Sequence, residues 1–181
     1  MGDEKPDLST VTPWQIGNIF GPKTAMTAKG EVVGRLIRAA KKPLLIAGAE
    51  ILEENAESKL NYVLRISRFG EIPVVATAHT PKHLRKGNLQ PAAAMGTVEI
   101  TDRLRDPNWS LDGKGPHDLA IFIGIAYQLQ SQMLSTLKHF APHLKTVSLD
   151  RYYHPNAGFS FPNLDEKTWI EALDRVVEAL K

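Results

Sequence analysis

Cysteine is missing from all 181 residues, and its absence excludes several kinds of chemistry at once. Without thiols the chain forms no disulfide, offers no thiolate nucleophile and supplies none of the usual ligands of an iron–sulfur cluster. No segment approaches the roughly 20 apolar residues of a membrane-spanning helix. The first ten residues lack the apolar run of a signal peptide. We therefore expect a cytoplasmic protein with no membrane partner.

A dominant charge of one sign is also missing. The chain has 22 Lys and Arg against 20 Asp and Glu, a formal charge of +2, so no strong field draws it to nucleic acid or to an acidic membrane surface. Hydrophobic residues make up 43% and charged residues 23%, which is typical of globular domains. We therefore expect one self-folding domain and no nucleic-acid partner.

The chain divides by pattern into two parts. Residues 1–27 hold several Pro and Gly and show no helical or strand period, which predicts an irregular N-terminal arm. Residues 28–181 are expected to form a single α/β nucleotide-binding-like domain. Four large apolar side chains of the arm have no periodic core of their own, so they either pack on the domain or bind a partner. The partner hypothesis assigns partner binding to Trp14, Ile16, Ile19 and Phe20.

Helical and strand patterns alternate through the domain. Buried strands are expected at residues 44–48, 72–76, 119–124 and 144–149, because each is a short apolar run. Helices are expected over 28–42, 56–69 with Gly70 just past the end, from Thr80, over 98–104, 129–140 and 169–180. This alternation predicts an α/β fold, a doubly wound and mainly parallel sheet of about 4–6 strands with helices on both faces.

Ligands of such sheets bind outside the carboxyl ends of the strands, near the helix N-termini. The candidate cofactor-binding residues are therefore those that follow the predicted strands: Gly48, Ala49, Glu50, Thr77, His79, Gly124, Tyr127 and Asp150. Neither the dinucleotide fingerprint nor the phosphate loop is present. Gly48 and Gly124 allow close approach of a phosphate or ring, but glycine also serves simply to turn a chain. Glu50 is suited to a ribose hydroxyl or is a solvated carboxylate.

Candidate catalytic and metal-binding residues are scarce. His79 and His83 stand four residues apart, a metal-like spacing that lacks a third ligand, and Pro81 places His79 before the helix. His139 and His143 are separated by a proline, which makes that pair weaker still. No nucleophile elbow and no conspicuous carboxylate pair is present. We therefore assign no catalytic and no metal-binding residue.

Several stretches together resemble the epsilon subunit of the archaeal acetyl-CoA decarbonylase/synthase complex. They are residues 12–19, 21–25, 42–50 and 118–124 followed by Tyr127, and the likeness extends over nearly the whole chain. The segment Lys-Pro-Leu-Leu-Ile-Ala-Gly within 42–48 is also similar to the NAD/FAD-binding-like central domain of thiamine diphosphate enzymes, a parallel-sheet domain that sometimes holds FAD.

The resemblance implies a partner, the large (alpha) subunit of carbon monoxide dehydrogenase, within a larger multisubunit complex of archaeal one-carbon metabolism. It implies that nickel and iron–sulfur clusters lie only in that partner. The first hypothesis is a noncatalytic accessory subunit that stabilises the large subunit. The alternative is a module that binds FAD or another nucleotide and passes electrons to flavin. A free-standing dehydrogenase or transferase is disfavoured, and a homo-oligomer is left open.

Overall fold

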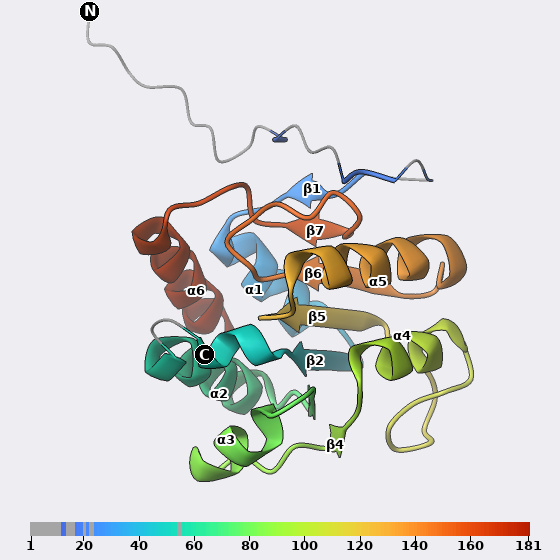
Figure 1. Cartoon of the computed structure of the whole chain (residues 1–181), viewed down its shortest axis with the longest axis horizontal. Coiled ribbons are helices and arrows are strands. Elements are labelled where there is room, and N and C mark those ends of the chain that lie inside the picture. Colours follow the sequence, from blue (N-terminus) through green and yellow to red (C-terminus); the bar gives the residue numbers. More distant parts are fainter. Residues whose placement is uncertain (1–11, 14–16, 20, 22–23, 54–55) are drawn as a thin grey trace, which may run out of the picture.

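A single parallel sheet organises the described part of the chain, which comprises residues 12–13, 17–19, 21, 24–53 and 56–181 of the computed structural model. Within these residues seven strands pair in the order β1-β7-β6-β5-β2-β3-β4, and every pairing is parallel (Figure 1). The strands are β1 (Met26–Thr27), β2 (Pro43–Ala47), β3 (Val74–Ala76), β4 (Ala93–Ala94), β5 (Leu119–Ile123), β6 (Lys145–Ser148) and β7 (Phe159–Ser160).

Helices cover both faces of this sheet. They are α1 (Gly30–Ala39), α2 (Ala56–Gly70), α3 (Thr80–Lys86), α4 (Thr97–Arg105), α5 (Tyr127–Phe140) and α6 (Glu166–Leu180), with a short 3₁₀ helix, η2 (Ala49–Leu52). The core on one face includes side chains of α1, α2, α3 and α6, and the core on the other includes those of α4 and α5. The expected doubly wound α/β architecture is therefore confirmed.

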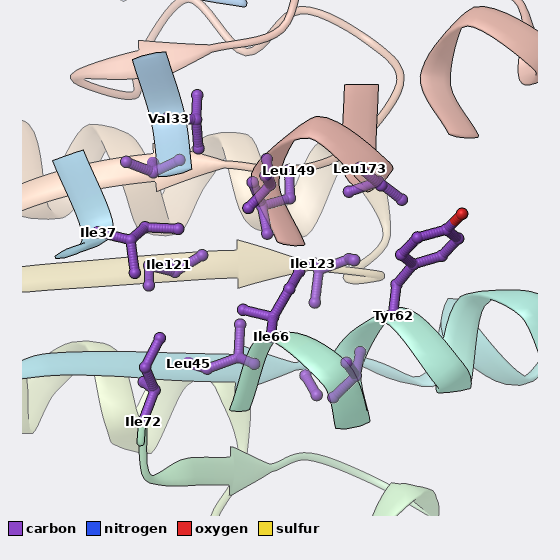
Figure 2. Packing of buried hydrophobic residues seen from close by; sticks show 14 of the residues in the cluster. Val33, Ile37, Leu45, Tyr62, Ile66, Ile72, Ile121, Ile123, Leu149 and Leu173 are labelled. Atoms are coloured by element: carbon purple, nitrogen blue, oxygen red, sulfur yellow. The ribbon is translucent and has the colours of Figure 1, made fainter. Parts of the chain in front are cut away.

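The central strands are continuous apolar runs in the sequence because both faces of the sheet are buried there. In β2, Leu45 belongs to the core under α1, α2 and α6, whereas Leu44 belongs to the core under α4 and α5. In β5, Ile121 and Phe122 divide between the two cores in the same way. Figure 2 shows the first core, where side chains of α1, α2 and α6 meet those of the strands.

Helices α1 and α6 approach each other closely at two glycines. A Cβ built on Gly34 would lie 2.5 Å from the Ala179 Cβ and 2.8 Å from the Val176 carbonyl oxygen, and a Cβ on Gly30 would overlap the Ala172 carbonyl oxygen. Asp165 is the N-cap of α6, and its carboxylate accepts the backbone N–H of Thr168 at 2.9 Å. The glycine spacing of four residues therefore lets α1 and α6 pack backbone against backbone.

The main differences from the sequence-based prediction lie at the sheet edges. The four predicted strands correspond to β2, β3, β5 and β6, but β1, β4 and β7 bring the total to seven. Each additional strand is only two residues long, too short to carry a period. Gly70 is the last residue of α2, and Glu71 adopts the left-handed conformation with φ of 51°. The placement of Gly70 just past the helix end was therefore wrong.

The segment before β1 is held against the domain. Ile19 donates its backbone N–H to the Asn156 side chain at 3.1 Å and accepts a hydrogen bond from the Lys138 Nζ at 2.9 Å. The Asn156 amide also donates to the Gly17 carbonyl at 3.1 Å. The Ile19 side chain nevertheless stays 46% exposed. Of the four predicted partner-binding residues, Trp14, Ile16 and Phe20 lie outside the described residues.

Candidate functional site

The carboxyl ends of β2 and β5 mark the point where the strand order reverses. From β2 the chain proceeds to β3 on one side, whereas β5 and β6 lie on the other. In open parallel sheets this reversal is where a ligand crevice normally forms. A cleft of about 210 Å³ opens here. It is lined by Glu50, Ile51, Lys59, Ile123, Gly124, Asp150, Arg151, Tyr152, Glu166 and Trp169.

Gly48 and Gly124 meet at the base of this crevice. A Cβ on Gly48 would overlap the Gly124 carbonyl oxygen, and a Cβ on Gly124 would overlap the Ile51 side chain, which is buried. Gly124 also has φ of 71°, a conformation that favours glycine. Both glycines thus serve close packing, and Gly124 also turns the chain, whereas Gly48 is extended.

The charges of the cleft are predominantly acidic. Three carboxylates, from Glu50, Asp150 and Glu166, line it together with two cations, Lys59 and Arg151. Burial raises the pKa of Glu50, and the nearby Glu53 raises it further, while Lys59 opposes the shift. A pKa raised by burial and by a like charge means that the ionised carboxylate is destabilised there. The lining thus carries one carboxylate more than it has cations.

Asp150, which follows β6, accepts three hydrogen bonds in the cleft. Its Oδ1 accepts the backbone N–H of Gly124 at 2.7 Å, and its Oδ2 accepts from the Gln130 Nε2 at 2.6 Å and from the Ser148 Oγ at 3.2 Å. Burial nevertheless raises the pKa of Asp150 to about 6, although these hydrogen bonds lower it. Asp150 therefore joins β5, β6 and α5 and changes its charge near pH 6.

His154 lies behind Asp150 with 1% of its side chain exposed. Its Nε2 is 3.9 Å from the Asp150 Oδ2, and neither ring nitrogen has a hydrogen-bond partner among the described residues. The ring stacks on Tyr127 at a centroid distance of 4.2 Å, and the Tyr127 hydroxyl donates to the Tyr153 carbonyl at 2.9 Å. Burial lowers the pKa of His154 to about 4. The imidazole is therefore neutral at physiological pH.

The predicted site residues divide into three groups. Gly48, Glu50, Gly124 and Asp150 gather at the reversal point, with Ala49 beginning η2 beside them. Thr77 and His79 follow β3, where Thr77 donates its N–H to the Ala47 carbonyl and His79 precedes α3 as expected. Tyr127 packs on His154 instead of lining the cleft. The structure thus brings part of the predicted set together and separates the rest.

Three backbone N–H groups at this edge already have acceptors within the protein. A dinucleotide pyrophosphate is normally held by backbone N–H groups at a glycine turn and a helix N-terminus. Here the Gly48 N–H donates to the Ile123 carbonyl, the Glu50 N–H to the Gly124 carbonyl and the Gly124 N–H to Asp150. The space beside Gly124 is filled by Ile51. These hydrogen bonds occupy three backbone N–H groups at the strand ends, whereas the first turn of α5 has no side-chain cap.

Metal ligands are not gathered anywhere in the described ranges. Within them no three His, Cys, Asp or Glu side chains are placed to hold a metal ion. His79 occupies the N-cap position of α3 without a side-chain cap bond, whereas His83 lies in the last turn of that helix. Likewise, the helices of the described part include none long and apolar enough to cross a membrane.

Four residues in or behind the cleft were missed from the sequence, two that line it, Ile51 and Trp169, and two that pack around Asp150, Gln130 and His154. Gln130 and His154 belong to the buried polar cluster around Asp150, Ile51 fills the space beside Gly124, and Trp169 of α6 lines the cleft while donating its indole N–H to the Leu149 carbonyl at 2.7 Å. Gln130 was one polar residue among several in a helix, and His154 followed no recognisable motif. The short η2 gave no periodic signal for Ile51.

Folding shifts the pKa values of Asp150 and His154 in opposite directions, and these shifts predict how the stability of the fold depends on pH. The folded state raises the pKa of Asp150, so that carboxyl favours folding at low pH and loses this contribution as pH rises through about 6. The folded state lowers the pKa of His154, so the imidazole favours folding above its unfolded pKa of about 6.5 and loses this as pH falls toward 4. Between pH 4 and 6.5 the two contributions oppose each other.

We therefore expect His154→Phe, which keeps the ring stack on Tyr127, to gain stability relative to the unsubstituted chain as pH falls from 7 to 4.5. Over the same range, Asp150→Asn should lose stability relative to the unsubstituted chain. This variant lacks the carboxyl group whose protonation stabilises the fold and so offsets the cost of protonating His154. Urea denaturation at several pH values measures both differences. Parallel profiles for all three proteins would contradict the assigned pKa directions.

Comparisons with known proteins place the chain among named relatives. The profile of the family described as CO dehydrogenase beta subunit/acetyl-CoA synthase epsilon subunit matches residues 7–177. A protein of Methanothermobacter thermautotrophicus is 41% identical over 167 residues, 92% of this chain and 94% of its own length. A protein of Methanothrix soehngenii is 40% identical over 173 residues, 93% and 91% of the two chains. Both are named acetyl-CoA decarbonylase/synthase complex subunit epsilon.

Among solved structures, a chain from Mycobacterium smegmatis is similar with a TM-score of 0.48 and 13% identity. Its name describes a thiamin diphosphate-dependent enzyme. The match covers 94% of this chain and 31% of the other.

Proposed function

Because the chain belongs to the CO dehydrogenase beta subunit/acetyl-CoA synthase epsilon subunit family, we propose that it is a noncatalytic subunit of an acetyl-CoA decarbonylase/synthase complex. In this role it binds the large subunit of carbon monoxide dehydrogenase and stabilises it. The observation that carries the proposal is the 41% identity to a named epsilon subunit over 92% of the chain.

The chemistry of the chain supports a role without catalysis of its own. Nickel–iron–sulfur centres are held mainly by thiolates, and the sequence has no cysteine. In the described residues, His, Asp and Glu form no group suited to a metal ion. The strongest polar cluster, around Asp150, is occupied by its own hydrogen bonds to Gly124, Gln130 and Ser148. The metal centres of the complex are therefore assigned to the large subunit.

The N-terminal arm supplies the contact with the large subunit in this proposal. The backbone of Ile19 is bonded to Asn156 and Lys138, while its side chain stays 46% exposed. An apolar side chain presented on a fixed backbone loses little conformational entropy when a partner covers it. The arm residues Trp14, Ile16 and Phe20 extend the apolar character of this segment in sequence.

The test is reconstitution of the full chain with its cognate large subunit. We expect the two to comigrate in gel filtration, the large subunit to withstand heating longer in the mixture, and the isolated chain to oxidise no CO. A large subunit that elutes alone, with unchanged heat inactivation, would contradict the proposal. A saturable FAD titration of the purified chain would instead favour transfer of electrons to flavin.

A further inference from the structure

A second hollow lies at the opposite end of the sheet from the cleft. This groove, of about 250 Å³, runs between the end of α5, the amino end of β6, the edge strand β1 and its neighbour β7, and Figure 1 shows β1 and β7 side by side. Its described lining residues are Thr24, Met26, Leu137, Lys138, Ala141, Pro142, Leu144, Lys145, Thr146, Asn156, Ala157, Gly158 and Phe159. We call it the α5–β1 groove.

The α5–β1 groove combines an apolar floor with basic charge. Leu137, Leu144 and Phe159 supply the floor, and Met26 stands over it with 57% of its side chain exposed. Both charged groups of the lining, Lys138 and Lys145, are cations, and none of the described lining residues is Asp or Glu. The Lys138 Nζ donates a hydrogen bond to the Ile19 carbonyl. Lys145 is exposed and forms no ion pair with the residues described.

The groove is continuous with the arm that the proposed function assigns to partner binding. Two of its lining residues, Asn156 and Lys138, are the same side chains that hold the backbone of Ile19. A partner that covers the exposed Ile19 side chain therefore lies next to the groove. Exposed apolar area next to uncompensated positive charge is complementary to an apolar segment that carries a carboxylate.

We propose that the α5–β1 groove is the docking site for a segment of the large subunit that inserts an apolar side chain beside Met26 and places a carboxylate against Lys145. This inference rests on the proposed function, because it locates the same association on the body of the domain. The apolar side chain stabilises the complex because docking removes it from water. The carboxylate fixes the position of the segment in the groove and increases the rate of association.

The experiment measures the affinity of full-length variants for the cognate large subunit at two salt concentrations. Met26→Glu and Lys145→Glu should each weaken binding at least tenfold, and Lys145→Glu should also reduce the dependence of affinity on salt. The matched controls are Phe69→Glu, at another exposed apolar position, and Lys82→Glu, at another exposed lysine. Both controls should bind as the unsubstituted chain does, and thermal melting should show all four variants folded.

The outcomes separate this inference from the proposed function. If the unsubstituted chain itself fails to bind, the proposed function falls and the inference with it. If it binds and both groove variants bind equally well, the groove is not the docking site, although the subunit role stands. If the groove variants instead abolish self-association of the isolated chain, measured by sedimentation, while binding the large subunit normally, the occupant is a second copy and the inference is wrong.

Discussion

Removal of residues 1–16 is expected to leave the domain folded while weakening its association with the large subunit at least tenfold, or about 1.4 kcal/mol. The deletion removes Trp14 and Ile16, and burial of one large apolar side chain contributes about 1.5–3 kcal/mol. Ordering the segment offsets part of this gain. The truncated chain keeps Gly17 and Ile19, through which Asn156 and Lys138 hold the segment. Urea denaturation and a binding isotherm measure the two effects separately.

Point substitutions in the full chain control for the loss of length. Trp14→Ala with Ile16→Ala should reproduce most of the weakened binding, whereas Thr12→Ala with Gln15→Ala should not. Unfolding of the truncated chain would mean that the arm belongs to the core. Unaltered affinity of a folded truncated chain would confine the contact to the body of the domain.

Of the variants considered, replacement of both Gly30 and Gly34 in α1 by alanine should lower the free energy of unfolding most. At an exposed helix position, Gly→Ala stabilises by up to about 1 kcal/mol. At Gly30 and Gly34 the added methyl groups instead meet α6, including the carbonyl oxygens of Ala172 and Val176, which cannot move without shifting the helix. Overpacking costs about 1–3 kcal/mol per site. The double variant should therefore melt well below the unsubstituted chain, by about 2–4 °C for each kcal/mol lost.

Two further variants test whether the contact with α6 is the cause. Gly96→Ala serves as the control, because nothing lies within 4 Å of a Cβ built there. Gly96 is the N-cap of α4, where alanine is less favourable than glycine, so a loss of about 1 kcal/mol is expected, well below that of the double variant. Ala179→Gly removes the methyl group nearest to Gly34, so adding it to Gly34→Ala should recover part of the lost stability. Equal destabilisation with and without Ala179→Gly would place the cause elsewhere.

The sequence predicted the central elements well, because their signals are local. Strands β2 and β5 are apolar runs buried on both faces, and α6 has an unbroken apolar stripe that includes Leu173 and Val177. Pro43 and Gly48 bound β2 from either side in the sequence, and the observed strand ends within one residue of them. Such patterns require only the residue types and their spacing.

The candidate site was only partly predictable. The rule that ligands gather at the carboxyl strand ends correctly brought Glu50, Gly124 and Asp150 to one cleft. The rule does not say which backbone N–H groups remain free, and here Asp150 occupies that of Gly124. The hydrogen bonding of the cleft therefore depends on contacts between residues 26 positions apart, which no local pattern contains.

The amino-acid sequence by itself determined the α/β class, the central strands, the lack of thiolate chemistry and the likeness to the epsilon subunit family. Tertiary structure alone decided the edge pairings of β1, β4 and β7, because two-residue strands have no period and form only where a neighbouring strand offers its backbone. It also decided the α5–β1 groove, whose lining comes from residues 24–26, 137–146 and 156–159. Those segments lie together because β7 pairs with both β1 and β6. Strands pair with their neighbours in space, whatever their order along the chain.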